Sequence, residues 1–358
     1  MRTALVTGSA GFVGSFVSER LLREGYRVVG LDSMNDYYEV SLKERRNSRL
    51  LDFANYHAVH ALLETPGILK DLFERERFDI VIHLAAQAGV RHSIENPRSY
   101  LDSNVVGTFE LLEAARAYPP RHMLLASSSS VYGARMDMDN PYREIDRTDH
   151  QVSFYAATKK AMESMAHSYA HLYNLPITVF RFFTVYGPWG RPDMALFKFT
   201  KAILQGDPID VYNHGDMKRD FTYIDDLVEA VCLLVDAIPE RSDIWDTVAK
   251  SSNHQSRSSR DPLKQQTDIP ESLSPVAPWR VVNIGNSEPV QLTDFIEAIE
   301  DATGFKAKRK LLPMQAGDVQ ATWADAELLR SLTGYRPKTS VQDGVLRFVE
   351  WYRGYYSV

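Results

Sequence analysis

The chain opens with TALVTGSAGFVG at residues 3–14, a short apolar run that leads through three glycines into a second apolar segment. The spacing Gly8-x-x-Gly11-x-x-Gly14 predicts a strand, a tight turn and a helix whose free N–H groups bind a pyrophosphate. Gly8 permits the turn, Gly11 permits close approach of the phosphate, and Gly14 lets the helix lie against the sheet. This stretch predicts a dinucleotide-binding fold.

A second strand at 27–32 completes a strand-helix-strand unit and ends in Asp32. An acid at this position accepts hydrogen bonds from an adenosine ribose diol and repels a 2′-phosphate, so we expect NAD rather than NADP. The alternative is a glycine turn that binds no nucleotide. Strand, glycines, helix and distal acid together argue against it.

Composition limits the classes of function. A chain of 358 residues is expected to form two lobes, and its net charge of -6 gives no reason to expect a nucleic acid or membrane partner. The single cysteine, Cys232, lies in an apolar run, so we expect a buried thiol and no internal disulfide. No cluster of metal ligands is seen. The first strand starts close to Met1 and no apolar run reaches ~20 residues, so we expect no signal peptide, no membrane span and a cytoplasmic protein.

Strand and helix signals alternate along most of the chain. This pattern predicts an α/β protein with a doubly wound parallel sheet of the Rossmann type and a smaller C-terminal α/β substrate-binding lobe. We expect the NAD-binding domain at 1–181, with 222–238 and 281–286 returning to it, and the substrate lobe at 182–358. A polar stretch at 251–278 predicts a mobile surface insertion. Further elements are expected as strands at 56–63, 79–84, 122–126 and 177–182, and as helices at 42–51, 97–117, 154–173, 199–205 and 348–356.

The candidate chemistry lies after the strand at 122–126. Tyr155 and Lys159 are four residues apart, which places them on one face of a helix. A nearby cation lowers the pKa of a tyrosine, so Tyr155 could remove a proton from an alcohol near neutral pH, and Lys159 could also hold the nicotinamide ribose. A hydroxyl from the serine run at 127–130 could bridge the substrate oxygen and the phenolate. The alternatives are a chance Tyr/Lys spacing and a polar strand cap.

The ensemble of motifs resembles the extended short-chain dehydrogenase/reductases that act on nucleotide sugars, over nearly the whole chain. The matching motifs are the glycine pattern, His83-Leu84-Ala85-Ala86, Asn104-x-x-Gly107-Thr108, Ser127-Ser128-Ser129-Ser130-Val131-Tyr132-Gly133, Tyr155-x-x-x-Lys159, Arg219-Asp220-Phe221-x-Tyr223-x-Asp225-Asp226 and Gly317-Asp318-Val319. The resemblance implies Ser128, Tyr155 and Lys159 as the catalytic set.

It also implies two groups of binding residues. The NAD contacts are expected at Gly8, Gly11, Phe12, Val13, Gly14, Asp32, Asn35, Leu84, Ala85, Ala86, Asn104, Tyr155, Lys159 and Phe183. The contacts to a UDP-sugar are expected at Arg91, Ser128, Ser129, Tyr155, Thr184, Arg191, Arg219, Gln315 and Asp318, with Arg219 on the diphosphate and Gln315 and Asp318 on the nucleotide ribose. No metal is implied.

The residues after Ser128 discriminate reactions within the family. Dehydratases of nucleotide sugars carry an Asp-Glu pair there, and UDP-glucuronate decarboxylases carry a glutamate at the second position, whereas this chain has Ser129 and Ser130. The stretches 31–43, 182–195 and 313–319 are similar to UDP-glucuronate 4-epimerases, and Thr184 stands where UDP-galactose 4-epimerases have asparagine. Two departures are a residue near Leu62 that replaces an acid expected at adenine, and the long insertion at 251–278.

The resemblance implies C4 epimerisation of a UDP-hexuronic acid through a 4-keto sugar. Tyr155 takes the 4-OH proton while the C4 hydride passes to NAD, and the ring then rotates about its diphosphate link. The hydride returns to the other face of C4 while Tyr155 gives the proton back to the oxygen. Thr184 and Arg191 are expected to hold the sugar carboxylate, since a guanidinium can meet it bidentately. The alternative for Arg191 is an exposed or phosphate-bound loop arginine.

Other functions stay open at this stage: a UDP-N-acetylhexosaminuronate or UDP-hexose 4-epimerase, a UDP-glucuronate decarboxylase, and a regulator that binds NAD without turnover. The resemblance also implies a homodimer through a four-helix bundle of the helices at 104–117 and 154–173. Its apolar contacts are expected at Leu111, Leu112, Met162, Met165 and Tyr169.

Overall fold

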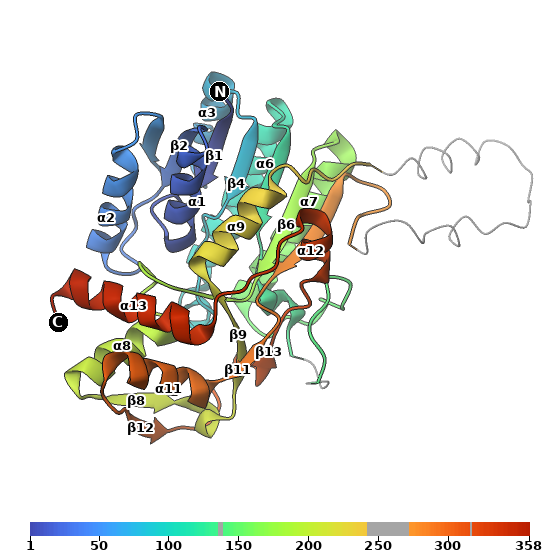
Figure 1. Ribbon diagram of the computed structural model, residues 1–358. Helices are drawn as coiled ribbons and strands as arrows, with labels where there is room; N and C mark the ends of the chain where they lie inside the picture. Colours follow the sequence, from blue (N-terminus) through green and yellow to red (C-terminus); the bar gives the residue numbers. More distant parts are fainter. Residues whose placement is uncertain (135–138, 242–271, 316) are drawn as a thin grey trace, which may run out of the picture.

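A seven-stranded parallel sheet forms the centre of the computed structural model, which describes residues 1–134, 139–241, 272–315 and 317–358 (Figure 1). The predicted doubly wound α/β fold is therefore confirmed. The third strand is shorter than predicted, and a late segment adds the seventh strand beside β6. In spatial order the strands are β10 (Trp279–Ile284), β6 (Ile177–Phe182), β5 (His122–Ala126), β4 (Ile80–His83), β1 (Thr3–Thr7), β2 (Arg27–Asp32) and β3 (Tyr56–His60).

Helices cover both faces of this sheet because its strands are apolar on both sides. In β1, Ala4 and Val6 pack on one face, while Leu5 packs on the other. The first face carries α1 (Phe12–Arg23), α2 (Val40–Leu51) and α9 (Ile224–Leu234), and the second carries α3 (Ile68–Glu76), α6 (Gly107–Ala117) and α7 (Phe154–Tyr173). Cys232 of α9 is buried as predicted, and burial raises the pKa of its thiol to about 12.

The predicted continuous helix at 97–117 is wrong in its first half. The structure has α5 (Pro97–Tyr100), then the π-helical turn η1 (Leu101–Val106), and then α6. A π turn adds a residue to the repeat and often occurs at functional sites. Here it turns the buried Asn104 side chain toward the segment after β4, where Asn104 donates to and accepts from the backbone of Gln87.

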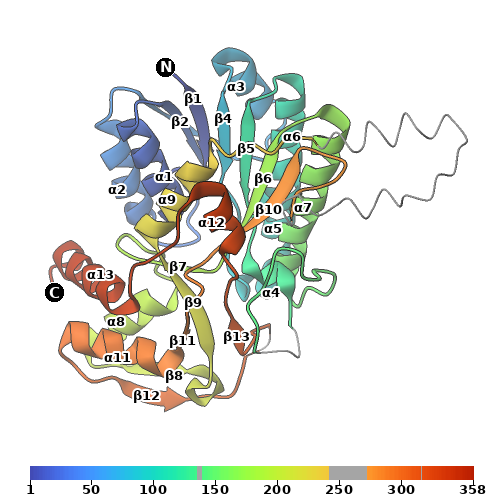
Figure 2. The same ribbon diagram turned by 45° about the vertical axis from the view of Figure 1, so that its right-hand side comes forward.

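The second lobe lies beyond the carboxyl ends of the central strands (Figure 2). Its strands form two small sheets, β7 (Thr184–Tyr186), β9 (Lys218–Tyr223), β11 (Pro289–Gln291) and β13 (Ala321–Thr322), and β8 (Pro208–Val211) with β12 (Lys308–Leu311). Its helices are α8 (Ala195–Gln205), α11 (Leu292–Thr303), α12 (Glu327–Thr333), which lies against α9, and the closing helix α13 (Val341–Tyr356). Among the described residues, no helix is long and apolar enough to cross a membrane.

The predicted insertion at 251–278 falls largely outside the described residues. Only 272–278 can be compared, and this end is not a free surface segment. Ser274 and Ala277 are buried, and the Ser274 hydroxyl lies 2.9 Å from Nε2 of His167 on α7. The polar composition misled the prediction here because a buried serine is accommodated once its hydroxyl has a partner.

Candidate active site

A cavity of about 1070 Å³ lies at the carboxyl ends of the parallel strands, between the central sheet and the second lobe. Its size exceeds that of ordinary small-molecule sites and is sufficient for a dinucleotide together with a second nucleotide. Open α/β sheets bind ligands at this edge. Most of the predicted site residues line it: Gly8, Gly11, Phe12, Val13, Gly14, Asp32, Asn35, Leu84, Ala85, Ala86, Arg91, Ser128, Ser129, Tyr155, Lys159, Phe183, Thr184, Arg191, Arg219 and Asp318.

Two predicted contacts do not line the cavity. Asn104 is 2% exposed, and its amide is used by the backbone of Gln87 and by the hydroxyl of Thr158. Its side chain therefore braces the segment that follows β4. Gln315 is likewise not among the residues that line the cavity, and its Oε1 atom is buried. The motif spacing located both residues near the site but could not give the direction of their side chains.

The glycine-rich turn fits a dinucleotide. Gly8 has φ of +72°, and a Cβ atom on Gly14 would lie 2.0 Å from the carbonyl oxygen of Gly8. Helix α1 begins after Gly11 with no side-chain cap, which leaves its first N–H groups to an anion. Asp32 accepts hydrogen bonds from the N–H groups of Ala10 at 3.0 Å and Met34 at 2.9 Å, so its carboxylate is fixed at the cavity wall. These residues fit NAD.

A buried histidine ties the end of β4 to β1 and α6. The Thr7 hydroxyl oxygen accepts a hydrogen bond from the N–H of Leu84. The hydroxyl also lies 2.8 Å from Nδ1 of His83 and can donate its own proton to that nitrogen. The Thr108 hydroxyl donates to a carbonyl, so it accepts from Nε2–H of His83 at 3.2 Å. His83 is thus a neutral imidazole with a defined tautomer, and burial lowers its pKa to about 3.

Tyr155 and Ser128 meet on one wall of the cavity, as the sequence predicted. The Ser128 hydroxyl lies 3.1 Å from that of Ser130 and accepts the Ser130 N–H at 3.2 Å, which orients it after β5. Burial raises the pKa of the Tyr155 phenol, while the hydrogen bond with Ser128 and the charge of Arg191 oppose that shift. The predicted lowering of this pKa by Lys159 is wrong for the geometry observed.

The Lys159 ammonium points elsewhere. It donates to the carbonyl of Ala126, at the end of β5, across 2.7 Å. Burial lowers the pKa of Lys159 to about 8, and the charge of Glu163, one helical turn further along α7, opposes this shift.

A buried ion pair lies behind the cavity wall that carries Ser128 and Tyr155, which we call the catalytic wall. Glu163 accepts from Nε and Nη2 of Arg181 at 2.9 and 2.8 Å and from the Ser127 hydroxyl at 2.7 Å. Burial alone would raise the pKa of Glu163, but Arg181 holds it below its ordinary value. The pair connects α7 and β6 to the residue immediately before Ser128.

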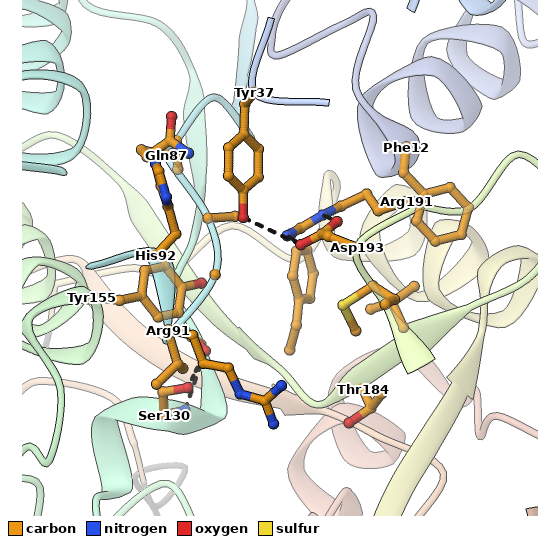
Figure 3. Close-up of a pocket in the computed structure, with 18 of the residues that line it drawn as sticks. Phe12, Tyr37, Gln87, Arg91, His92, Ser130, Tyr155, Thr184, Arg191 and Asp193 are labelled. Atoms are coloured by element: carbon orange, nitrogen blue, oxygen red, sulfur yellow. Dashed lines mark hydrogen bonds and ion pairs between the residues drawn. The ribbon is translucent and has the colours of Figure 1, made fainter. Parts of the chain in front are cut away.

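Arg191 faces Tyr155 from the opposite wall (Figure 3). Its Nε and Nη2 atoms donate to the carboxylate of Asp193 at 3.0 and 2.5 Å, and the Tyr37 hydroxyl donates to the same carboxylate at 3.3 Å. Burial alone would raise the pKa of Asp193, but the Arg191 cation holds it below its ordinary value. The cation also lies close enough to oppose the rise in the pKa of Tyr155.

The far end of the cavity, toward the second lobe, is basic. Arg219 of β9 donates to the carbonyls of Lys218, Val319 and Gln320, so its guanidinium is held firmly at the wall. Arg91 forms an ion pair with Asp318 at 3.0 Å. This end therefore carries Arg219 and Asp318, which were predicted to bind the nucleotide diphosphate and ribose, together with Arg91, which was predicted to contact the UDP-sugar.

Sequence reasoning gave no role to three residues that the structure places at the site. Tyr37 and Asp193 complete the Arg191 cluster, and the Arg191-x-Asp193 spacing was the available signal for the pair. Arg46 of α2 is fully buried and donates to the carbonyls of Ala10, 3.3 Å away, and Gly190, 3.2 Å away. It links the glycine-rich turn to the Arg191 loop, and nothing in its charged sequence context indicates burial.

Comparison with known proteins adds three findings. Residues 4–244 match the family described as NAD dependent epimerase/dehydratase. A probable UDP-glucuronate 4-epimerase of Rhizobium meliloti (strain 1021) is 51% identical over 97% of this chain and 96% of its own length, and UDP-glucuronate 4-epimerase 3 of Arabidopsis thaliana is 44% identical over 99% of this chain and 77% of its own. The solved structure of a UDP-glucuronic acid 4-epimerase from Bacillus cereus, in complex with UDP-glucuronic acid and NAD, is 29% identical with a TM-score of 0.83, covering 99% of this chain and 100% of that one.

Proposed function

Because this chain belongs to the NAD dependent epimerase/dehydratase family, we propose that it inverts C4 of a UDP-hexuronic acid, interconverting UDP-glucuronate and UDP-galacturonate with NAD as cofactor. One observation carries the proposal. A single cavity holds the Tyr155 phenol beside Ser128 on one wall and the Arg191 guanidinium on the facing wall. Ser129 and Ser130 follow Ser128, so neither position offers the carboxylate that elimination of water would need.

The chain's own residues manage the proton and the sugar. Tyr155 takes the proton of the 4-hydroxyl and later returns it, with the Ser128 hydroxyl orienting the oxygen. NAD, when bound, would supply the reversible hydride transfer at C4 that the inversion requires. Thr184 and Arg191 hold the sugar carboxylate, and Arg219, Arg91 and Asp318 hold the UDP part.

The cofactor residues follow from the fit of the glycine-rich turn. The N–H groups that open α1 would bind the pyrophosphate, with Asp32 on the adenosine ribose. Lys159 would bind the nicotinamide ribose, with its ammonium anchored by the Ala126 carbonyl. The proposed NAD-binding domain is 1–181 with 222–238 and 281–286, and the proposed substrate lobe is 182–358.

We also propose a homodimer and a cytoplasmic location. The predicted interface needs a correction, because Leu111, Leu112 and Met162 are at most 1% exposed within one chain and cannot serve a partner. Met165 and Tyr169 of the predicted interface are only partly buried, and Phe109 of α6, 43% exposed, and Leu172 of α7, 63% exposed, are further apolar side chains that a four-helix bundle would cover. A monomer by light scattering at micromolar concentration would contradict the dimer.

Incubation of the purified protein with UDP-glucuronate tests the function. We expect UDP-galacturonate, with no requirement for added NAD if the cofactor stays bound. Release of CO2 and a UDP-pentose would indicate a decarboxylase. Turnover of UDP-glucose or of a 2-acetamido uronate in place of UDP-glucuronate would move the substrate to those classes, and no turnover with NAD bound would indicate a regulator.

A further inference from the structure

The carboxylate of Asp193 occupies one edge of the Arg191 guanidinium. A guanidinium presents two edges that can each bind a carboxylate bidentately, Nε with Nη2 and Nη1 with Nη2. Asp193 takes the first edge, and the Tyr37 hydroxyl, from the segment between β2 and α2, fixes the outer oxygen of Asp193. All three side chains line the cavity.

We infer that Asp193 is a positioning residue that locks Arg191 so that its Nη1 edge meets the sugar carboxylate in one orientation. This inference rests on the proposed function and deepens it. A free arginine loses rotamer entropy when it is fixed, and otherwise follows a moving ligand. A locked guanidinium instead forces the ligand carboxylate to one place.

The proposed chemistry requires such control. A sugar with a ketone at C4 and a carboxylate on C5 is a β-keto acid. Loss of CO2 breaks the C5–C6 bond, leaves the electron pair at C5 in conjugation with the ketone, and gives a 4-keto pentose once C5 is protonated. The reaction needs that bond to align with the carbonyl π system, so a carboxylate held out of that alignment survives until the ketone is reduced.

A simple loop brace is the competing explanation for the pair. Two features argue against it. The side chains of Arg191 and Asp193 are 22% and 28% exposed, unlike the Arg181–Glu163 pair, whose side chains are 3% and 1% exposed. The pair also has a third partner, Tyr37, from a distant segment of the chain. A brace between neighbouring loop residues needs neither access to the cavity nor that phenol.

The experiment uses the Asp193→Asn variant of the full chain and measures ligand affinity separately from kcat. The variant removes a negative charge beside the sugar carboxylate and also the anchor of Arg191. We therefore expect the binding preference for UDP-glucuronate over UDP-glucose, measured by calorimetry, to rise by roughly twofold to tenfold, while kcat for epimerisation falls by roughly tenfold to a hundredfold. The fraction of turnovers ending in CO2 or in bound NADH should rise.

Asp149→Asn is the matched control. Arg147 and Asp149 have the same spacing, with an Nε–Oδ2 distance of 2.8 Å, but their side chains are 81% and 55% exposed, away from the cavity. The Asp149→Asn variant should leave ligand binding, kcat and the products unchanged. Tyr37→Phe, which keeps the ion pair, should raise the CO2 fraction less than Asp193→Asn does.

Unchanged kcat and products in Asp193→Asn, or equal weakening of both ligands, would overturn the inference. If the wild-type protein does not epimerise UDP-glucuronate, the proposed function fails, and the calorimetric preference still decides whether Asp193 controls Arg191. A preference that falls or stays constant would then reject the inference independently.

Discussion

Replacing Glu163 by glutamine removes the buried charge that supports the catalytic wall. The glutamate accepts two hydrogen bonds from Arg181 and one from Ser127, at 2.7 to 2.9 Å. Glutamine has nearly the same volume, so the change creates no cavity. It leaves the Arg181 guanidinium, whose side chain is 3% exposed, without its counter-ion.

The cost follows from that burial. Breaking a buried ion pair by removing one partner costs about 3–5 kcal/mol, and the retained amide oxygen places this variant near the lower end. Stabilities of about 5–15 kcal/mol leave the variant folded in buffer. Glu24→Gln is the control. Glu24, the residue after α1, pairs with Arg20 of α1 at 2.5 Å with both side chains 37% exposed, and such pairs contribute about 0.3–0.5 kcal/mol.

Urea denaturation of both variants measures this difference in free energy of unfolding. A second readout is the pH dependence of epimerisation. Burial lowers the pKa of Lys159 to about 8 and Glu163 opposes the shift, so Glu163→Gln should lower that pKa further and move the alkaline limb of kcat/KM to lower pH. Equal destabilisation by the two variants, with an unmoved alkaline limb, would refute the reasoning.

Three further predictions concern the cofactor turn, the sugar site and a buried histidine. Gly14→Ala should cost about 1–3 kcal/mol and abolish NAD binding by calorimetry, because its Cβ would lie 2.0 Å from the Gly8 carbonyl oxygen, whereas Gly354→Ala, with open space around it, should cost nothing. Arg191→Ala should weaken UDP-glucuronate roughly tenfold to a hundredfold and leave UDP-glucose unchanged; equal weakening would mean that Arg191 does not bind the carboxylate. His83→Asn tests whether His83 is a neutral imidazole, because the unfolded chain takes up a proton at His83 near pH 6.5 and the folded chain only at about pH 3. The difference in free energy of unfolding between wild type and variant should therefore be largest above pH 6.5 and fall by up to about 1.4 kcal/mol per pH unit below it. The same difference in urea titrations at pH 7 and pH 5 would contradict this prediction.

The sheet and its helices could be predicted because their signals are local. Apolar strands, glycines that allow close backbone approach, and helical spacing are properties of short segments, and α7 was predicted with its observed bounds, Phe154–Tyr173. The π turn at Leu101–Val106 could not be predicted. A helix with one extra residue in one turn has nearly the same apolar pattern as a continuous one, yet that residue decides which way Asn104 points.

Helical spacing also could not distinguish side chains that serve the chain's own core from those available to a partner. Leu111 and Met162 fit the apolar face of a helix equally well as core residues or as interface residues. Only their packing against the sheet shows that they are buried within one chain. Arg46 shows the reverse case. A charged helix predicts a solvated face, but the guanidinium is buried because backbone carbonyls from two distant loops converge on it.

The surroundings of the Tyr155 phenol show why sequence spacing alone cannot identify the group that shifts its pKa. Tyr155 and Lys159 share a helical face as predicted, but the ammonium is directed at the Ala126 carbonyl. Burial therefore dominates and raises the pKa of Tyr155, with Ser128 and Arg191 opposing it from other elements. A positive charge that enters the cavity with a ligand would favour the phenolate and oppose the effect of burial. The acidity of Tyr155 should therefore depend on occupancy, and its pKa should shift toward lower pH in an ultraviolet titration when NAD is bound.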